Sequence, residues 1–271
     1  MEIPIYQADA FASGLFRGNP AAVCPLDRWL PDATLQAIAL ENNLSETAYY
    51  VPAGPDRYQL RWFTPTVEVD LCGHATLATA SVISEVRRET ASTRLTFESK
   101  SGELLVDRED GLYHLNFPSR PPESCSANPH LLAGLNLAPA AILASPATIL
   151  ASQDYFCVYE SEDQVRSLQP DMARLAAIDR FAVIVTAPGK DCDFVSRFFA
   201  PSKGVPEDPV TGRAHTTLIP YWSKRLGKQK LFARQVSRRG GEIWCQDLGP
   251  RVRIGGRAVQ YLEGRITVPL Q

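Results

Sequence analysis

The sequence predicts an α+β protein built from two similar lobes, and three observations lead to this fold class. The chain has 271 residues, which lies between one large domain and two small ones at roughly 100–200 residues per domain. Short stretches that alternate apolar and polar residues outnumber helical patterns, so strands are expected to dominate. A strand, a glycine turn and a helix also occur twice in the same order, about half a chain apart.

Two short strings define the repeat. The string Arg61–Pro65 has the pattern Arg-aromatic-Phe-x-Pro and returns as Arg197–Pro201, 136 positions later. The pattern Gly-x-Ala at Gly73–Ala75 returns as Gly212–Ala214, 139 positions later. Both separations are close to half of the 271 residues, which favours a duplicated architecture over chance matches.

Each copy has the same predicted local structure. Tyr58–Phe63 alternates as a half-buried strand does, and Pro65 ends it. The runs Gly73–Ser84 and Ala214–Arg225 have the composition and spacing of helices. A helix that starts at such a turn presents free backbone N–H groups and the positive end of its dipole. Two such helix starts facing each other would form an anion site between the halves, suited to a small carboxylate.

The other predicted elements are mostly strands. Two further helices are predicted, at Pro31–Asn42 and near Asp171–Ala177. The Pro- and Ser-rich stretch Pro118–Ser124 is the clearest linker. It divides the chain into an N-terminal lobe at 1–118 and a C-terminal lobe at 125–271. The last segment of the chain is able to fold back and join the N-terminal lobe. The predicted strands are Ile3–Phe11, Ala21–Cys24, Thr47–Val51, Arg94–Glu98, Leu104–Asp107, Leu112–Phe117, Tyr155–Tyr159, Phe181–Thr186, Asp193–Phe199, Arg234–Val236, Gly241–Cys245 and Ala258–Arg265.

Composition excludes several classes of partner. The net charge of -2 offers no basic excess for a phosphate backbone, so no nucleic acid is expected to bind. No apolar run approaches the roughly 20 residues that cross a bilayer, and Met1–Gln7 has no secretory signal pattern. The six cysteines contain no C-x-x-C pair, which predicts reduced thiols and a cytoplasmic location.

No metal or nucleotide cofactor is predicted. The four histidines form neither an HExxH motif nor a Cys/His cluster with zinc-site spacing. The chain also has no GxGxxG and no GxxxxGK[ST] motif, the glycine-rich loops that hold dinucleotides and nucleotide phosphates. We therefore expect a protein that acts on a small molecule without a cofactor.

Two residues of the first half are candidates for proton chemistry. Glu46 opens the apolar run Thr47–Val51, where a carboxylate shielded from water would be a general base and an exposed one a simple strand end. His74 follows Gly73 at a predicted helix start. That position suits either a functional imidazole or a structural histidine.

Two residues of the second half, Asp208 and Arg213, and one further residue of the first half, Cys72, are also candidates. Asp208 lies just before the second repeated helix, where it is either a catalytic group or a helix cap. Arg213 either clamps a carboxylate or lies in solvent. Cys72 is either an activated thiol or a small buried cysteine. Its counterpart in the repeat is Thr211, which cannot be the second acid or base of a two-thiol racemase.

Five short strings, which contain most of these candidate residues, resemble the PhzF-like family of phenazine biosynthesis proteins and follow one another in the order found in that family. The resemblance extends to the region 252–266 and covers essentially the whole chain. Each string is short, but their combination is highly specific. The strings are Phe16–Val23, Leu44–Ala48, Phe63–Pro65, Leu71–Thr76 and Glu207–Gly212.

The resemblance implies a diaminopimelate epimerase-like fold, in which each lobe is a sheet curled around a central helix. It places the active site in the cleft between the lobes. It also implies a cofactor-independent isomerase, often a homodimer. In the phenazine pathway the substrate is trans-2,3-dihydro-3-hydroxyanthranilate. One of its ring carbon–hydrogen bonds is broken, and the proton returns at another carbon.

The same resemblance assigns roles to particular residues. The catalytic glutamate of the family falls on Glu46, and the histidine and aspartate near the substrate fall on His74 and Asp208. The glycines at the two helix starts, Gly73 and Gly212, are implied to bind the substrate.

One position departs from the family pattern. The family commonly has Thr-Gly-Ser-Ala-His, and its serine touches the substrate, whereas this chain has Arg213 at that place. Arginine is longer and always charged. It can bind a substrate carboxylate with two hydrogen bonds, or it can fill the cleft and exclude the usual substrate.

Three hypotheses for the function follow. The first is an isomerase or epimerase in which Glu46 moves a proton between carbons of a small cyclic or amino carboxylate. The second is a non-catalytic carboxylate-binding relative, suggested by Arg213. The third is a thiol-dependent racemase or epimerase, which would require Cys72 to react.

Overall fold

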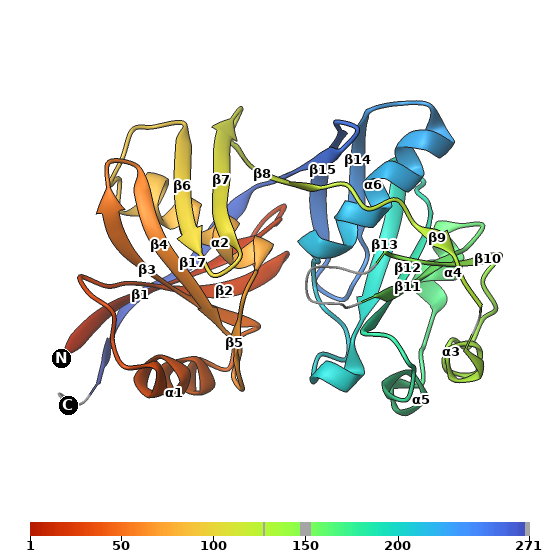
Figure 1. The fold of residues 1–271 in the computed structure, drawn as a ribbon, viewed down its shortest axis with the longest axis horizontal. Helices are drawn as coiled ribbons and strands as arrows, with labels where there is room; N and C mark the ends of the chain where they lie inside the picture. Colours follow the sequence, from red (N-terminus) through yellow and green to blue (C-terminus); the bar gives the residue numbers. More distant parts are fainter. Residues whose placement is uncertain (127, 147–152, 269–271) are drawn as a thin grey trace. The chain divides into compact units, whose positions relative to one another are not determined.

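The computed structural model describes residues 1–126, 128–146 and 153–268. The chain forms two compact units (Figure 1). Unit 1 consists of Met1–Asn116 with Gly255–Gln271, and unit 2 consists of Phe117–Ile254. The boundary lies next to the predicted linker, whose last two residues form the short strand β9 (Glu123–Ser124). No helix in the described ranges is long and apolar enough to cross a membrane.

Unit 1 is built on a mixed sheet. Its strands pair in the order β17–β1–β2–β3–β4–β6–β7–β8, and the short β5 also pairs with β4. The pairs β2–β3 and β4–β6 are parallel, and a parallel pair needs a crossover connection. The strands are β1 (Glu2–Ala10), β2 (Asn19–Pro25), β3 (Glu46–Gly54), β4 (Arg57–Phe63), β5 (Glu68–Val69), β6 (Arg94–Ser99), β7 (Gly102–Glu109), β8 (Leu112–Pro118) and β17 (Ala258–Thr267).

Two helices occupy those crossovers. Helix α1 (Asp32–Asn42) connects β2 to β3, and helix α2 (Gly73–Ser81), followed by a π-helical turn at Val82–Val86, lies between β4 and β6. Every residue of α2 from His74 onward is buried, and the helix packs against β1, β2 and β3. A helix that is buried all round belongs to a core. The sheet of unit 1 is therefore arranged around a central helix.

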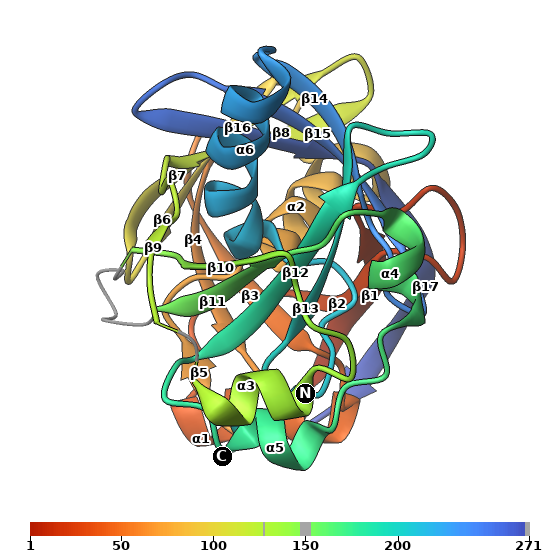
Figure 2. The ribbon, with the colours of Figure 1, turned by 90° about the vertical axis from the view of Figure 1, so that its right-hand side faces the viewer.

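Unit 2 contains a second mixed sheet. Its strands pair in the order β9–β10–β11–β12–β13–β14–β15. The long helix α6 packs against β14 and β15, and the short helices α3 and α5 lie side by side (Figure 2). The elements are β10 (Ala141–Ala144), β11 (Asp154–Val158), β12 (Ala182–Pro188), β13 (Phe194–Phe199), β14 (Lys230–Gln235), β15 (Gly241–Asp247), β16 (Arg251–Gly256), α3 (Pro129–Gly134), α4 (Glu162–Ser167), α5 (Met172–Ala176), a 3₁₀ turn at Pro201–Lys203, and α6 (Gly212–Leu226).

The strand pairings repeat between the units. In unit 1 the series from β1 to β7 is antiparallel, parallel, antiparallel, parallel and antiparallel, with α2 in the second parallel crossover. In unit 2 the series from β10 to β15 is the same, with α6 in the second parallel crossover. The predicted α+β fold of two similar lobes is confirmed.

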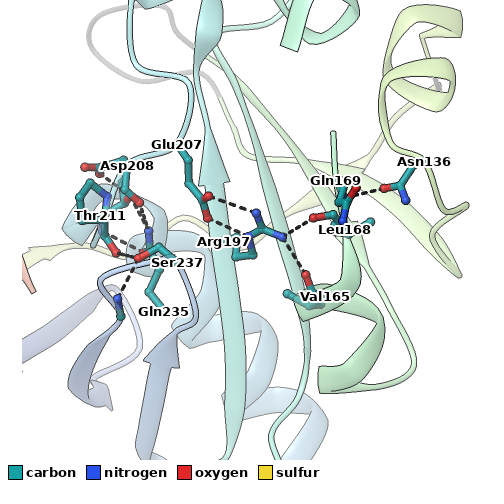
Figure 3. Close-up of polar contacts among 12 residues, drawn as sticks. Asn136, Val165, Leu168, Gln169, Arg197, Glu207, Asp208, Thr211, Gln235 and Ser237 are labelled. Carbon is teal, nitrogen blue, oxygen red and sulfur yellow. Dashed lines mark hydrogen bonds and ion pairs between the residues drawn. The ribbon is translucent and has the colours of Figure 1, made fainter. Parts of the chain in front are cut away.

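The repeated Arg-aromatic-Phe string has a structural role in both units. Arg61 of β4 binds Glu68 through Nε and Nη2 at 2.7 and 3.0 Å. Arg197 of β13 binds Glu207 in the same way at 2.7 and 3.1 Å (Figure 3). Each guanidinium also lies over the ring of the phenylalanine two residues further on, 5.1 and 4.8 Å from its centroid. The arginine therefore ties each strand to the segment that leads to the central helix.

The C-terminal strand belongs to unit 1. Strand β17 pairs antiparallel with β1, from Glu2 opposite Thr267 to Ala10 opposite Ala258. A β-bulge between Gln7 and Ala8 interrupts this register. Unit 2 accordingly ends at Ile254, before the end of the chain.

Several element boundaries differ from the prediction. The helix predicted at Gly73–Ser84 leaves α geometry after Ser81 and continues as a π-helical turn. The helix predicted near Asp171–Ala177 is one residue shorter at each end, because Asp171 is its N-cap and accepts from the amides of Ala173 and Arg174. The sequence did not predict α3, α4 or β10, which have four to six residues and are too short to show a period.

Replacing Arg197 with alanine is expected to lower the free energy of unfolding by about 2–3 kcal/mol, because Glu207 would lose the partner of a mostly buried ion pair. Arg197 also donates to the carbonyl oxygens of Val165 and Leu168. Urea unfolding measures the change. The control is Arg57→Ala, which removes an ion pair between exposed side chains and should leave the midpoint unchanged. Equal effects of the two substitutions would contradict this role of Arg197.

Candidate active site

The polar site of unit 1 forms where two parallel strands begin. Asn19 opens β2 and Glu46 opens β3, and the register places Glu46 beside Ala21. His74 is the second residue of α2, which packs against both strands. Residues that are far apart in the sequence thus meet at one end of the sheet.

His74 is in contact with three other side chains at this place. Its Nε2 lies 3.0 Å from Oε2 of Glu46, and the two side chains are 8% and 18% exposed. On the other side of the ring, Nδ1 lies 3.4 Å from Sγ of Cys72 and 3.4 Å from Nδ2 of Asn19. The structure therefore brings together Glu46 and His74, and it places neither as an isolated solvated group.

Gly18 fixes the entry of the chain into this site. Its φ is +73°, and a Cβ atom there would lie 2.3 Å from the carbonyl oxygen of Ala10. A side chain is therefore excluded at this position on both conformational and steric grounds. The tight approach holds the buried Asn19 beside the imidazole of His74.

Burial and neighbouring charges act in opposite directions on these groups. Burial disfavours the imidazolium of His74, but the interactions with Cys72 and Glu46 outweigh it, and the pKa of His74 lies well above its usual value. Burial raises the pKa of the Cys72 thiol. The negative charge of Glu46 adds to this rise, and the imidazole of His74 opposes it.

The polar site of unit 2 lies at the start of α6. The hydroxyl of Thr211, the N-cap residue, donates to Oδ2 of Asp208 at 2.5 Å. Gln235 at the end of β14 donates to the carbonyl oxygen of Asp208 at 2.7 Å and accepts from the amide of Thr211 at 2.9 Å. Figure 3 shows these three side chains grouped beside the start of the helix. Gln235 thereby fixes both ends of the turn that carries Asp208.

Arg213 is held within unit 2 by a buried partner. Its Nη2 lies 2.5 Å from Oδ1 of Asp154, and the side chains are 29% and 5% exposed. The guanidinium also lies over the ring of Phe181, 4.4 Å from its centroid. Burial raises the pKa of Asp154, and the guanidinium of Arg213 opposes that rise. Arg213 is therefore a positioned cation and does not lie free in solvent.

His215 lies one turn inside α6 and is fully buried. Its Nδ1 lies 2.8 Å from the carbonyl oxygen of Thr211, so Nδ1 carries the proton and donates. In unit 1 the corresponding residue is Thr76, whose hydroxyl donates to the carbonyl oxygen of Cys72 at 2.6 Å. The same turn of both central helices is thus secured by a side chain four residues further on. Burial lowers the pKa of His215 to about 4.

The two sites correspond in place but differ in chemistry. The second residue of the central helix is His74 in unit 1 and Arg213 in unit 2, and each contacts a polar residue that opens a strand. Glu46 opens β3, whereas the equivalent strand β12 opens with Ala182. Alanine cannot accept a proton, so the candidate base is present in one unit and is not duplicated.

The sequence did not indicate three residues of these sites. Asn19 lies in a string used only for the family resemblance, whereas Asp154 and Gln235 lie in no motif. Their contacts with His74, Arg213 and Thr211 depend on strand register, and composition carries no signal for them. The string Arg213–Ala214 predicts a positive charge at the start of a helix, but it does not predict that Asp154 holds the side chain of Arg213 in place.

The fold defines the class of protein. The structure is similar to that of a hydroxyproline epimerase from Agrobacterium vitis, with a TM-score of 0.60 over 98% of this chain and 92% of the other, at 10% sequence identity. At this identity the likeness concerns the fold alone. The protein therefore shares the fold of this epimerase, in agreement with the epimerase-like fold that the family resemblance implied.

Sequence comparison assigns the chain to one family among the proteins that have this fold. The chain matches the family model of phenazine biosynthesis-like proteins, PhzC-PhzF, over residues 8–264, and it belongs to this family. It is 51% identical over 266 residues to an uncharacterized isomerase of Pseudomonas aeruginosa, covering 98% of this chain and 99% of the relative. A crystal structure of a PhzF-family protein from Enterococcus faecalis superposes with a TM-score of 0.92 at 46% identity, over 99% of this chain and 100% of that one.

His215 makes the stability of the protein depend on pH. Its pKa is about 4 in the folded chain and about 6.5 in an unfolded one. The unfolded state therefore binds more protons between these values, and stability is lost as the pH falls. The expected loss attributable to His215 between pH 7 and pH 5 is about 2 kcal/mol.

The measurement compares urea unfolding of the wild type and of His215→Thr at both pH values. Threonine is chosen because Thr76 makes the equivalent hydrogen bond in unit 1. The variant should lose less stability on acidification than the wild type, and the control is the exposed His130, replaced in the same way. An identical pH dependence of wild type and His215→Thr would show that His215 does not cause it.

Proposed function

We propose that this protein is a cofactor-independent isomerase that moves a proton between carbons of a small cyclic or amino carboxylate. The observation that carries the proposal is the contact of Glu46 with His74 at 3.0 Å, at a largely buried place. Membership of the PhzC-PhzF family and relatives named isomerases support it.

In the proposed reaction Glu46 is the proton carrier. Its carboxylate removes a proton from a substrate carbon whose electron pair is delocalised into a conjugated system. The resulting carboxylic acid then returns this proton to a different carbon, so that Glu46 ends as it began. One carboxyl group is sufficient for this shuttle. The alanine that opens β12 supports a mechanism with one base.

His74 and Asp208 are proposed to orient and hold the substrate. The imidazole of His74, whose Nε2 lies 3.0 Å from Oε2 of Glu46, would donate to a heteroatom of the substrate. The proximity of Cys72 and Asn19 restricts the rotation of the ring. Asp208 is fixed by Thr211 and Gln235. Groups that are held in place before the substrate arrives reduce the reorganisation that the transition state requires.

The carboxylate of the substrate is proposed to bind near the helix starts. Gly73 and Gly212 are the first residues of α2 and α6, where the helix dipole favours an anion. Arg213 adds a fixed positive charge at the second of these starts. Because the family commonly has serine there, we propose that the substrate is related to trans-2,3-dihydro-3-hydroxyanthranilate in reaction type and differs in structure.

A thiol-dependent racemisation is less well supported by the geometry. Cys72 contacts His74, as an activated thiol would, but burial raises its pKa. Its equivalent in unit 2 is Thr211, whose hydroxyl donates to Asp208. The position before α6 that corresponds to Cys72 therefore carries a hydroxyl and no thiol. We favour the carboxylate of Glu46 as the base.

Replacing Glu46 with glutamine should lower kcat by about 10²–10⁴-fold, the usual contribution of a general base. Glutamine keeps the shape of the side chain but cannot carry the proton. The assay is the uptake of solvent deuterium or the isomerisation of a panel of cyclic amino and hydroxy carboxylates. The matched control is Glu41→Gln, an exposed glutamate at the end of α1. Full turnover by Glu46→Gln would show that Glu46 is not the base. A panel on which the wild type binds carboxylates but never turns over would favour the non-catalytic relative.

Replacing Arg213 with serine should raise the KM for the carboxylate at least tenfold, with a smaller effect on kcat. The substitution also leaves Asp154 buried without this partner, which is expected to destabilise the protein. The double variant Asp154→Asn, Arg213→Ser removes both charges, and should recover stability without recovering KM. Arg225→Ser, at the far end of α6, is the matched control. An unchanged KM in both Arg213 variants would exclude Arg213 from substrate binding.

A further inference from the structure

We propose that Glu46, Cys72 and His74 together form a binding site for a soft divalent cation such as Zn²⁺. One carboxylate oxygen, the sulfur atom and one ring nitrogen of these three residues all lie within 4.8 Å of one another. The proposal concerns binding and does not rest on the isomerase reaction. If the protein both binds the cation and catalyses the proposed isomerisation, the cation would inhibit the enzyme. It would occupy the oxygen and nitrogen atoms that hold and move the proton.

The chemistry of the three ligands suits zinc. Thiolate sulfur, imidazole nitrogen and carboxylate oxygen are its usual protein ligands, at about 2.3, 2.0 and 2.0–2.2 Å. Two such ligands at a tetrahedral ion lie about 3.3–3.7 Å apart. Nε2 of His74 and Oε2 of Glu46 already lie 3.0 Å apart. One ion binds a single ring nitrogen, and Sγ of Cys72 lies on the other side of the ring, 3.4 Å from Nδ1. A change in the side-chain torsions of Cys72 and Glu46 would therefore be needed to complete a three-ligand site on Nε2 with a fourth position open.

The unsatisfied atoms of the site also point to a cation. Nε2 of His74 and Oε2 of Glu46 are both buried, and neither has a hydrogen bond of good geometry within the described ranges, although they lie 3.0 Å apart. The side chain of His74 is more than nine-tenths buried and is directed at Glu46. A buried polar atom that lacks a hydrogen bond is costly, and a coordinated ion would satisfy it. The thiol of Cys72 is a weak hydrogen-bond partner, so its contact with the ring is easily replaced by a metal bond. The contact of Asn19 with Nδ1 of His74 would remain and would hold the ring in place.

This site could not be recognised from the spacing of its residues. Cys72 and His74 are two positions apart at the start of α2, whereas Glu46 is 26 positions before Cys72 and opens β3. No zinc motif has this spacing, and the sequence therefore predicted no metal. The parallel register of β2 and β3 and the packing of α2 on them create the site.

The experiment uses the full chain, freed of metal by dialysis against a chelator, with Co²⁺ as a spectroscopic substitute for Zn²⁺. The expected result is binding of one cobalt ion, with the intense absorption of a thiolate–cobalt bond and the visible bands of a tetrahedral ion. Zn²⁺ should displace the cobalt. Cys72→Ala should abolish the thiolate absorption and weaken Zn²⁺ binding in calorimetry at least tenfold. Cys125→Ala, which removes a partly exposed cysteine of unit 2, should change neither.

Three outcomes would overturn the proposal: no thiolate absorption in the wild type, the same absorption in Cys72→Ala, or Zn²⁺ affinity that Cys72→Ala and Cys125→Ala lower equally. The cobalt spectrum of the wild type is informative even if Cys72→Ala does not fold. Glu46→Gln separates this inference from the proposed function, because it should weaken Zn²⁺ binding at least tenfold whether or not any substrate is isomerised.

Discussion

The contact between Glu46 and His74 is the interaction on which the proposed chemistry of this protein depends. It exists because two parallel strands begin at the same end of a sheet and because α2 packs with its first turn against them. The helix is almost entirely buried, so it has little freedom to shift, and the imidazole is held by this packing. A carboxylate beside a fixed imidazole, at a place with little access to water, is a suitable arrangement for transferring a proton to and from carbon.

Duplication explains both the framework of the protein and the asymmetry of its chemistry. Both units use the same series of strand pairings and the same ion pair between an arginine and a glutamate, Arg61 with Glu68 and Arg197 with Glu207. The framework is therefore symmetric where it provides stability. It differs where chemistry is expected, since the second helix position is His74 in one unit and Arg213 in the other. One unit carries the proposed proton acceptor, and the other carries a fixed positive charge with a buried counter-ion, Asp154.

The sequence predicted the fold class and the repeat, because strings such as Arg61–Pro65 carry their own structural meaning. It also selected Glu46, His74, Asp208 and Arg213, since they lie in recognisable strings at the helix and strand starts. It did not reveal the interactions of these residues with one another. Proximity of Glu46 to His74, or of Asp154 to Arg213, depends on strand register and helix packing, which no local pattern contains. The role of Cys72 as a neighbour of both ring and carboxylate is likewise a property of the folded chain.

The claim that Glu46 is the base is tested most directly by the exchange of a carbon-bound hydrogen of the substrate with ²H₂O. NMR monitors this exchange in a buffer that contains a chelator. It compares the wild type with Glu46→Gln and Cys72→Ala. We predict that exchange is lost in Glu46→Gln, although that variant still binds the carboxylate, and that it continues in Cys72→Ala. Exchange that continues in Glu46→Gln and disappears in Cys72→Ala would contradict the account and identify the thiol as the base.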